Sequence, residues 1–362
     1  VKGLPKNPKL SNISWSPDQK RIALTNTTET GVELWVLELE NGSVTKLTEP
    51  NLNSNIGSVI NWFADSENML VKMISNNRKS LIDTNQIVPD GPTISTNFGE
   101  KAQNRTYQDL LKNKFDEHNF EQLSTSAIYK VSIDGDVKKW MDDGMYRTIS
   151  FSPNGEYVMI SQINKPFSYL VTYSRFPTET NVYSKDGNFI SNLLNVPLIE
   201  ELPKGFMSAR TGKRSFSWRP DKGASLTYVT ALDSGDPSKK VDFRDEVYEL
   251  NYPFLGKGKF MLKTINRFSG IDWGNKDMAI AYDTWWNTRN RKSYVFNPSN
   301  PNIKPKIISD RNYQDTYSDP GVFLRSRNEF NRSVLKMHYG NVFLRGHCLL
   351  YTSDAADEHR RG

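Results

Sequence analysis

The sequence predicts an all-β fold, a β-propeller, on two observations. Residues 13–49 (ISWSPDQKRIALTNTTETGVELWVLELENGSVTKLTE) contain four short strand patterns in a row, at 13–15, 21–26, 32–39 and 44–47. The same pattern of an aromatic residue, a turn and an alternating strand then recurs along the chain. A four-stranded meander cannot cover both of its faces alone, so repeated copies are expected to pack on one another.

The turns of the first copy support its four strands. Ser16-Pro17-Asp18 ends the first strand, because proline presets φ and the aspartate side chain bonds back to the backbone. The second strand alternates, and the third is apolar on both faces, as a strand covered on both sides is. Asn41-Gly42 is the dipeptide that a two-residue hairpin turn requires, since both positions need positive φ.

Four further copies follow the first. Segments 149–161 and 216–229 repeat it closely, and 59–71 and 271–282 repeat it without the proline. Most intervals are near the roughly 40–55 residues of a propeller blade, and the longest carries an insertion. A β-sandwich is the less favoured alternative. The repeated aromatic positions are Trp15, Trp62, Phe151, Trp218 and Trp273.

The insertion, at about 81–125, contains a Pro/Gly-rich loop and one helical pattern. In RTYQDLLKNKFDEHNF, one helical face carries Tyr107, Leu110, Leu111 and Phe115. Thr106 with Asp109 has the spacing of a capping box. We therefore expect a short helix here. Two readings stay open: the helix projects over one rim of the propeller, or it fills a gap between blades.

Strand patterns resume at 127–140, and another blade is expected to begin at 317–337. We expect residues 1–346 to form one partial propeller domain. The last sixteen residues, 347–362 (HCLLYTSDAADEHRRG), break the pattern and resemble translated sequencing-adapter read-through. We therefore exclude them as a non-native tail.

Composition argues against several kinds of partner and cofactor. The net charge is +6, but the 47 basic residues are scattered among 41 acidic ones, which disfavours a nucleic-acid-binding face. There is one cysteine, Cys348, and the four histidines lack metal-ligand spacing. No apolar run of about 18 residues suggests a membrane span. We expect no cofactor, no metal, no nucleic acid and no membrane span.

Motifs of catalysis are missing from the sequence. It contains no G-x-S-x-G, no G-x-G-x-x-G, no P-loop and no H-E-x-x-H. The two side chains of an adjacent acidic pair such as Asp142-Asp143 would point to opposite faces of a strand. They are therefore not expected to act together as a general acid and a general base. We therefore expect no catalytic residues in this chain.

Several strings together carry a family resemblance over about residues 1–346. They are GLPKNPKLSNISWSPD, VPDGPTIS, RTYQDLLKNKFDE, SYLVTYSRFP, FSWRPDK and YSDPG. The chain resembles the N-terminal propeller of the glutamyl endopeptidases, a branch of the prolyl oligopeptidase family of serine peptidases. The resemblance implies five to six blades of a seven-bladed ring. It also implies peptide substrates cleaved after Glu and a partner α/β-hydrolase domain in the full-length chain. No triad position of that domain is present here, so whether this chain is itself an enzyme stays open.

That resemblance implies a gating role for the propeller and directs attention to its arginines, because Arg binds carboxylate bidentately. Arg175 and Tyr173 are the first candidates for substrate binding, and the rings of Tyr169, Tyr173 and Phe176 could hold the arginine in place. Arg289 and Arg291, beside Trp285 and Trp286, are the second. The alternative for each arginine is pairing with a blade carboxylate or simple solvation.

Two questions stay open at this point. The rival function is a stand-alone, TolB-like propeller that binds proteins without catalysis. The compartment is unknown, with a periplasmic or secreted location favoured over the cytoplasm for a bacterial member.

Overall fold

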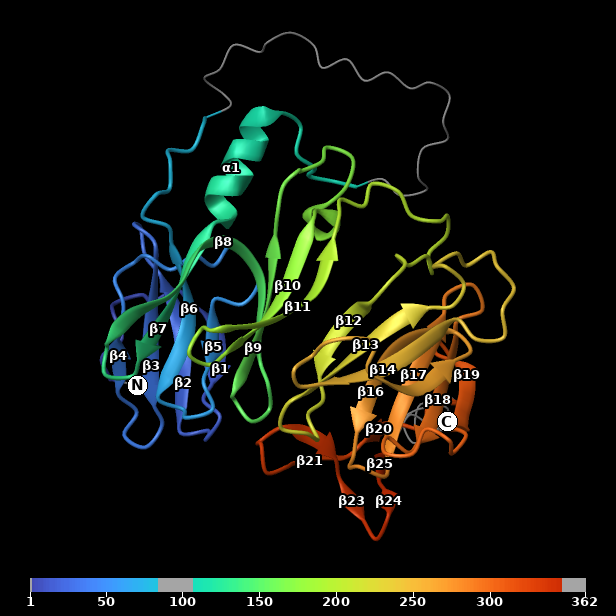
Figure 1. Cartoon of the computed structure of the whole chain (residues 1–362). Coiled ribbons are helices and arrows are strands. Elements are labelled where there is room, and N and C mark those ends of the chain that lie inside the picture. Colours follow the sequence, from blue (N-terminus) through green and yellow to red (C-terminus); the bar gives the residue numbers. More distant parts are fainter. Residues whose placement is uncertain (1, 84–106, 347–362) are drawn as a thin grey trace, which may run out of the picture. The chain divides into compact units, whose positions relative to one another are not determined.

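The computed structural model describes residues 2–83 and 107–346. The chain divides into two compact units, residues 1–201 and 202–362, and each is described here by itself. Both are built almost wholly from antiparallel strands (Figure 1). The tail 347–362, excluded above as non-native, lies outside the described residues.

The first unit opens with a four-stranded sheet. Its strands are β1 (Leu10–Trp15), β2 (Arg21–Thr27), β3 (Val32–Glu38) and β4 (Val44–Lys46), and they pair in chain order. The four strands predicted within 13–49 are therefore confirmed, with boundaries shifted by up to three residues. We call this sheet blade 1.

A seven-stranded sheet follows, in which one long strand belongs to two meanders. Its order is β11-β10-β9-β8-β7-β6-β5. Strand β8 pairs with β7 through residues 137–144 and with β9 through residues 145–151. Blade 2 is therefore β5, β6, β7 and the first half of β8, and blade 3 is the second half of β8 with β9, β10 and β11. The bounds are β5 (Ile60–Trp62), β6 (Asn68–Ile74), β7 (Ser126–Ser132), β8 (Val137–Phe151), β9 (Tyr157–Ile163), β10 (Thr178–Ser184) and β11 (Phe189–Val196).

The second unit contains two further four-stranded meanders, blades 4 and 5, each paired in chain order. Blade 4 is β12 (Arg214–Trp218), β13 (Ser225–Ala231), β14 (Asp245–Asn251) and β15 (Lys259–Thr264). Blade 5 is β16 (Arg267–Trp273), β17 (Ala279–Trp285), β18 (Asn290–Phe296) and β19 (Lys306–Asn312). The five four-stranded blades found among the described residues confirm the predicted all-β, propeller-class fold.

After blade 5 the strands become very short. The three pairs are β20 (Val322–Phe323) with β25 (Leu344–Arg345), β21 (Arg325–Arg327) with β22 (Ser333–Leu335), and β23 (Met337–His338) with β24 (Asn341–Val342). The sequence predicts that another blade begins at 317–337. Within the described residues this segment forms two-stranded pairs and no four-stranded sheet.

The repeated aromatic residues occupy equivalent positions. Each is the last residue of the first strand of its blade, except Phe151, which ends the shared strand β8. Trp62 packs among the apolar residues of blade 1, and its indole Nε1 donates to the Ser14 carbonyl at 3.1 Å. Trp273 likewise packs against blade 4. Trp15, in the first blade of the chain, is 56% exposed. Trp62 and Trp273 therefore fill the seam with the preceding blade of their own unit.

The Ser-Pro turns explain why the motif recurs. Ser16 Oγ donates to Asp18 Oδ1 at 2.6 Å and accepts from the Arg21 N–H at 2.9 Å. Ser152 makes the same pair of bonds with Asn154 and Tyr157. One serine hydroxyl thus bonds both to the side chain in the turn and to the backbone N–H where the next strand begins. These bonds fix the register of the two strands that the turn connects.

The predicted helix exists, but its start was wrong. Helix α1 (Lys114–Ser124) is capped by Asn113, whose side chain accepts from the N–H groups of Phe115 and Asp116 at 2.9 Å. Asp109, expected in a capping box, has φ +54° before the helix, and Thr106 lies outside the described residues. Asparagine is among the best N-cap residues, so it sets the boundary here.

Helix α1 is anchored to blade 3 by aromatic contacts. The ring of Phe120 lies 5.1 Å from Phe167 and 5.7 Å from Phe176, in the segment between β9 and β10. The side-chain amide of Asn53 donates to the carbonyls of Leu123 and Thr125 at 2.9 Å, at the helix end. Within the described ranges, no helix is long and apolar enough to cross a membrane.

Candidate functional site

Arg175 lies in a different aromatic environment from the one predicted. It ends a short 3₁₀ turn, Tyr173–Arg175, and its guanidinium carbon lies 5.5 Å from the ring centroid of Tyr107. The ring of Tyr173 instead contacts Arg147, whose guanidinium carbon lies 5.9 Å from the ring centroid. Phe176 is buried, stacked on Phe167. The inserted segment therefore supplies the ring beside Arg175, and sequence proximity to Tyr173 was a poor guide.

Arg289 folds back on its own hairpin. It lies in the turn between β17 and β18, with its guanidinium carbon 3.8 Å from the Trp286 ring centroid. Its Nη1 also donates to the Trp286 carbonyl at 2.7 Å. The predicted contact with Trp286 is present, whereas Trp285 is covered by Arg244, 3.9 Å from its ring centroid. Arg289 therefore stabilises its own turn, and one of its guanidinium nitrogens is already hydrogen-bonded to the backbone there.

Arg291, two residues on, points into a cavity. The cavity has a volume of about 370 Å³ and lies on the face of blade 5 opposite the buried seam with blade 4. Residues from all four strands of blade 5 and from the segment 319–325 line it. Of the four residues predicted for substrate binding, Arg291 alone is among those lining this cavity.

The charges that line the cavity do not balance. Three arginines and two aspartates line it. Arg311 Nη2 pairs with Asp319 at 2.6 Å, and Arg325 pairs with Asp272. Within the described part of the chain, Arg291 has no carboxylate partner. The described residues of the lining therefore carry one more positive than negative charge.

The guanidinium of Arg291 is held by a tyrosine ring. Its carbon lies 4.5 Å from the ring centroid of Tyr282, whose hydroxyl donates to Asp272 Oδ2 at 2.9 Å. Burial and the neighbouring Asp272 carboxylate raise the pKa of Tyr282 well above its usual range. The ring is therefore neutral and its hydroxyl stays a donor, so Tyr282 fixes Arg291 without competing for its N–H groups.

Two serine hydroxyls complete this wall of the cavity. Ser293 on β18 and Ser309 on β19 are directly paired across the strands, and both line the cavity. Among the residues that the structure describes, neither hydroxyl has a hydrogen-bond partner. A charged fork and two free hydroxyls on one wall suit a small oxyanion, because all of them can donate to it.

The sequence did not single out Tyr282, Ser293 or Ser309. Arg291 and Ser293 are two apart on one strand, so the period-two rule places them on one face. That signal was available once a strand had been assigned to 290–296. The contributions of Tyr282 and Ser309 depend on cross-strand register, which sequence patterns alone do not fix.

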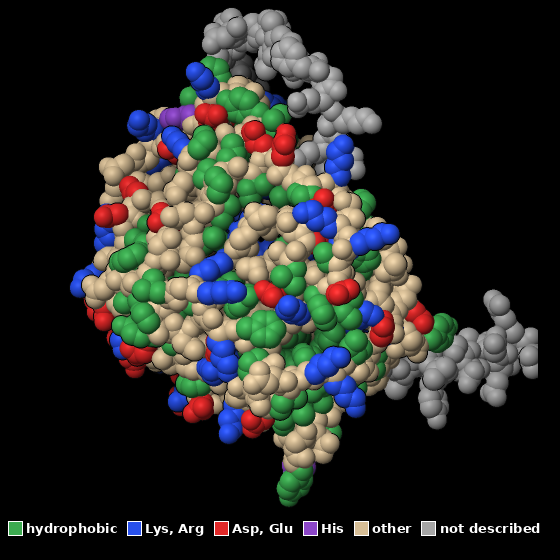
Figure 2. Space-filling view, turned by 45° about the vertical axis from the view of Figure 1, so that its right-hand side comes forward, with side chains coloured by type: hydrophobic (Ala, Val, Ile, Leu, Met, Phe, Trp, Pro, Cys, Tyr) green, Lys and Arg blue, Asp and Glu red, His purple; other side chains and the backbone are tan. Residues whose placement is uncertain are grey.

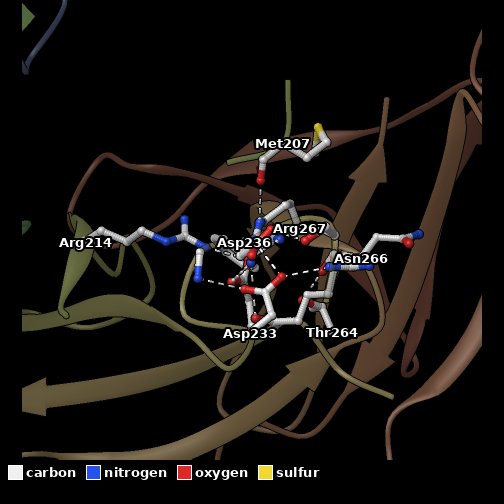
Figure 3. Close-up of polar contacts among 12 residues, drawn as sticks. Met207, Arg214, Asp233, Asp236, Thr264, Asn266 and Arg267 are labelled. Atoms are coloured by element: carbon white, nitrogen blue, oxygen red, sulfur yellow. Dashed lines mark hydrogen bonds and ion pairs between the residues drawn. The ribbon is translucent and has the colours of Figure 1, made fainter. Parts of the chain in front are cut away.

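A second cluster of charges in the same unit is structural. Arg267 donates from Nη2 to Asp233 at 2.7 Å and from Nε to the Met207 carbonyl at 2.8 Å, and it pairs with Asp245 at 3.2 Å (Figure 3). Both carboxylates are fully buried. Arg214 and Arg244 pair with them as well. The cluster ties the first strand of blade 5 to blade 4 and to the loop that enters blade 4.

The arginine of the FSWRPDK string has a structural role too. Arg219 is 1% exposed and donates to both oxygens of Asp221 and to Glu249 at 2.6–3.1 Å. Its guanidinium carbon lies 4.2 Å from the ring centroid of Trp273 in blade 5. Burial opposes ionisation of Glu249, but hydrogen bonding from Lys222 and the charge of Arg219 outweigh it and lower its pKa.

Charges elsewhere are mixed. On the face shown in Figure 2, Lys and Arg side chains are interspersed with Asp and Glu. In the ranges 2–83 and 107–346, no group of three or more His, Cys, Asp or Glu side chains could hold a metal ion.

The chain is homologous to part of two curated proteins. It is 34% identical over 347 residues to a probable chloroplastic glutamyl endopeptidase of rice. The aligned region covers 92% of this chain and 37% of that protein. It is 31% identical over 346 residues to the Arabidopsis thaliana protein of the same name, covering 92% and 36%. The predicted kinship with glutamyl endopeptidases is therefore confirmed, and the chain spans little more than a third of its relatives' length.

Similar solved structures include several enzymes. An oligogalacturonate lyase from Vibrio parahaemolyticus aligns with TM-score 0.48 and 10% identity, over 91% of this chain and 71% of that one. The β-propeller domain of the Trilobed protease from Pyrococcus furiosus aligns with TM-score 0.44 and 10% identity, over 95% and 85%. No protein-family model matches the chain.

Proposed function

We propose that this chain is the propeller part of an endopeptidase that cleaves peptides at glutamate, and that the propeller controls which substrates reach the active site. The observation that carries the proposal is the 34% identity over 347 residues to a protein named a probable glutamyl endopeptidase. We include in the proposal a serine nucleophile and membership of the prolyl oligopeptidase family. The catalytic residues would lie on another part of the full-length protein.

The physical basis of gating is rigidity. The seam between blades 1 and 2 is a continuous apolar core that includes Leu34, Val36 and Trp62. The seam between blades 4 and 5 is apolar as well and is crossed by the Arg267 ion pairs. Blades held in this way resist opening, so a narrow entrance would admit flexible peptides and exclude folded proteins. Excluding bulk water would also strengthen electrostatic interactions at the site.

The test uses the full-length product of the gene. Unstructured peptides of about 10, 30 and 60 residues, each with one central Glu, are compared by kcat/KM. Gating predicts a steep fall with length, and replacement of Glu by Gln should abolish cleavage of the shortest peptide. Length-independent cleavage would contradict gating. A coding sequence that ends without a G-x-S-x-G motif, and a product that binds these peptides without cleaving them, would favour the binding module instead.

A further inference from the structure

We propose that the cavity on blade 5 binds the carboxylate side chain of an acidic residue in a peptide, with Arg291 as its anchor. The inference deepens the proposed function, because it assigns a place on the propeller to the acidic residue of a substrate. It rests on the charges, hydroxyls and dimensions of the cavity described above.

The first support is geometric. The guanidinium of Arg291 lies over the Tyr282 ring at 4.5 Å, so the ring occupies one of its faces while the N–H edge stays available. A carboxylate pairs best with that edge, through two parallel N–H···O bonds. Because the stacked side chain is already ordered, less rotamer entropy is lost when the ligand binds.

The second support is the charge of the lining. Among the described residues of the lining, Arg311 and Arg325 are paired with Asp319 and Asp272, which leaves Arg291 without a carboxylate partner. One bound carboxylate would bring the lining from one net positive charge to zero. A neutral amide of the same shape would leave the positive charge unmatched, so the site should prefer Glu to Gln.

The third support is size and wall chemistry. A volume of about 370 Å³ is at the small end of ligand cavities and can hold one side chain with its flanking peptide groups. Val322 and Phe323 also line it and offer apolar contact for methylene groups. The hydroxyls of Ser293 and Ser309 provide further donors to the carboxylate oxygens.

Arg289 provides the matched control. It is also an arginine stacked on an aromatic ring of blade 5, at 3.8 Å, and it lies only two residues away. It differs in that its Nη1 is bonded to a backbone carbonyl and it does not line the cavity. Removing it changes the net charge by the same amount without touching the proposed site.

The experiment is a calorimetric or NMR titration of the 362-residue chain at low salt with N-acetyl-glutamate amide, N-acetyl-glutamine amide and N-acetyl-alanine as probes. We expect the glutamate probe to bind at least about tenfold more tightly than the glutamine probe. Arg291→Gln should weaken its binding at least about tenfold, and Arg291→Lys less, because charge remains but the fork is lost. Arg289→Gln should leave binding unchanged.

Several results would overturn the proposal. They are equal binding of the glutamate and glutamine probes, an equal loss in Arg289→Gln, or no loss in an Arg291→Gln protein that melts like the wild type. N-acetyl-alanine bound as tightly as the glutamate probe would overturn the side-chain assignment in favour of a chain terminus, and chloride competing at equal concentration would show a general anion site. Binding is measured without cleavage, so its failure leaves the endopeptidase proposal standing, and an inactive full-length protein leaves the cavity result standing.

Discussion

Two sets of arginines lie on opposite sides of blade 5 and differ in what they contact. At the seam with blade 4, Arg267 is 5% exposed, and its N–H groups donate to two buried aspartates and two backbone carbonyls. In the cavity on the other face, Arg291 contacts a tyrosine ring and faces open volume. The difference separates an arginine that holds the fold from one whose donors remain available to a ligand.

The energetic consequence of the difference is large. A buried charge that loses its partner is costly, since the remaining ion is left desolvated and unpaired. A partly exposed cation without a carboxylate partner leaves no such ion behind when it is removed. Substitutions on the two sides of blade 5 should therefore separate stability from binding, and the predictions below go from the largest expected effect to the smallest.

The largest effect should come from Arg267→Ala. The change leaves Asp233 and Asp245, both fully buried, with one arginine fewer, and we expect the free energy of unfolding to fall by about 3–5 kcal/mol. Urea unfolding followed by tryptophan fluorescence measures it. Arg289→Ala is the control and should stay within about 0.5 kcal/mol of the wild type. A loss below about 1 kcal/mol in Arg267→Ala would show that the seam does not depend on these pairs.

The aromatic residues at the seams provide the next comparison. Trp273→Ala removes a buried ring from the blade 4–blade 5 core and should cost about 3 kcal/mol. Trp15→Ala changes the equivalent position in blade 1, where the ring is 56% exposed, and should cost less than about 1 kcal/mol. Thermal melts of the two variants side by side measure the difference. Equal losses would contradict the assignment of these rings to the seam with the preceding blade.

The sequence predicted the features that repeat. The strands of blade 1 and the five aromatic positions follow from local patterns, and so do the Ser-Pro turns, whose hydroxyl bonds involve residues at most five apart. Periodic patterns and turn chemistry are local, so they survive without knowledge of the tertiary structure.

The features that failed depend on distant residues or on competing local signals. Arg175 lies over Tyr107, which is 68 positions away in the sequence (175 − 107), so neighbouring rings misled the prediction. Asn113 outcompeted the capping box proposed at Thr106 and Asp109. The cavity joins Asp272, Tyr282, Arg291 and Ser309 from four strands, and only the cross-strand register brings them together.

A third kind of cation, buried with no carboxylate partner in the part of the chain that the structure describes, should respond to pH. Lys72 on β6 is 2% exposed, and burial lowers its pKa to about 8. The pKa of a lysine in the unfolded chain is about 10.4. Between these values the unfolded state binds more protons, so stability rises with pH there. Below pH 8 the folded protein retains a desolvated ammonium, which is destabilising.

Lys72→Met should therefore stabilise the protein at pH 7, by on the order of 2 kcal/mol. The advantage of the variant over the wild type should shrink as the pH rises from 8 toward 10. Urea midpoints of both proteins at pH 7, 8.5 and 9.5 measure this, and the difference between them cancels other titrating groups. A constant difference across this range would show that Lys72 keeps an ordinary pKa.

The smallest effect on stability should come from the cavity. Arg291→Gln breaks no ion pair among the described residues, and we expect its free energy of unfolding to lie within about 0.5 kcal/mol of the wild type. The same urea titration used for Arg267→Ala measures it. A loss of several kcal/mol would place Arg291 with the structural arginines and remove the contrast between the two sides of the blade.

A crystal structure of the chain with N-acetyl-glutamate amide tests the central claim most directly, since it shows which arginine takes the carboxylate. We predict the ligand carboxylate within about 3 Å of the Arg291 N–H edge, with Ser293 or Ser309 as a second donor. A carboxylate seated instead on Arg175 or Arg289, with the blade 5 cavity holding none, would contradict the account.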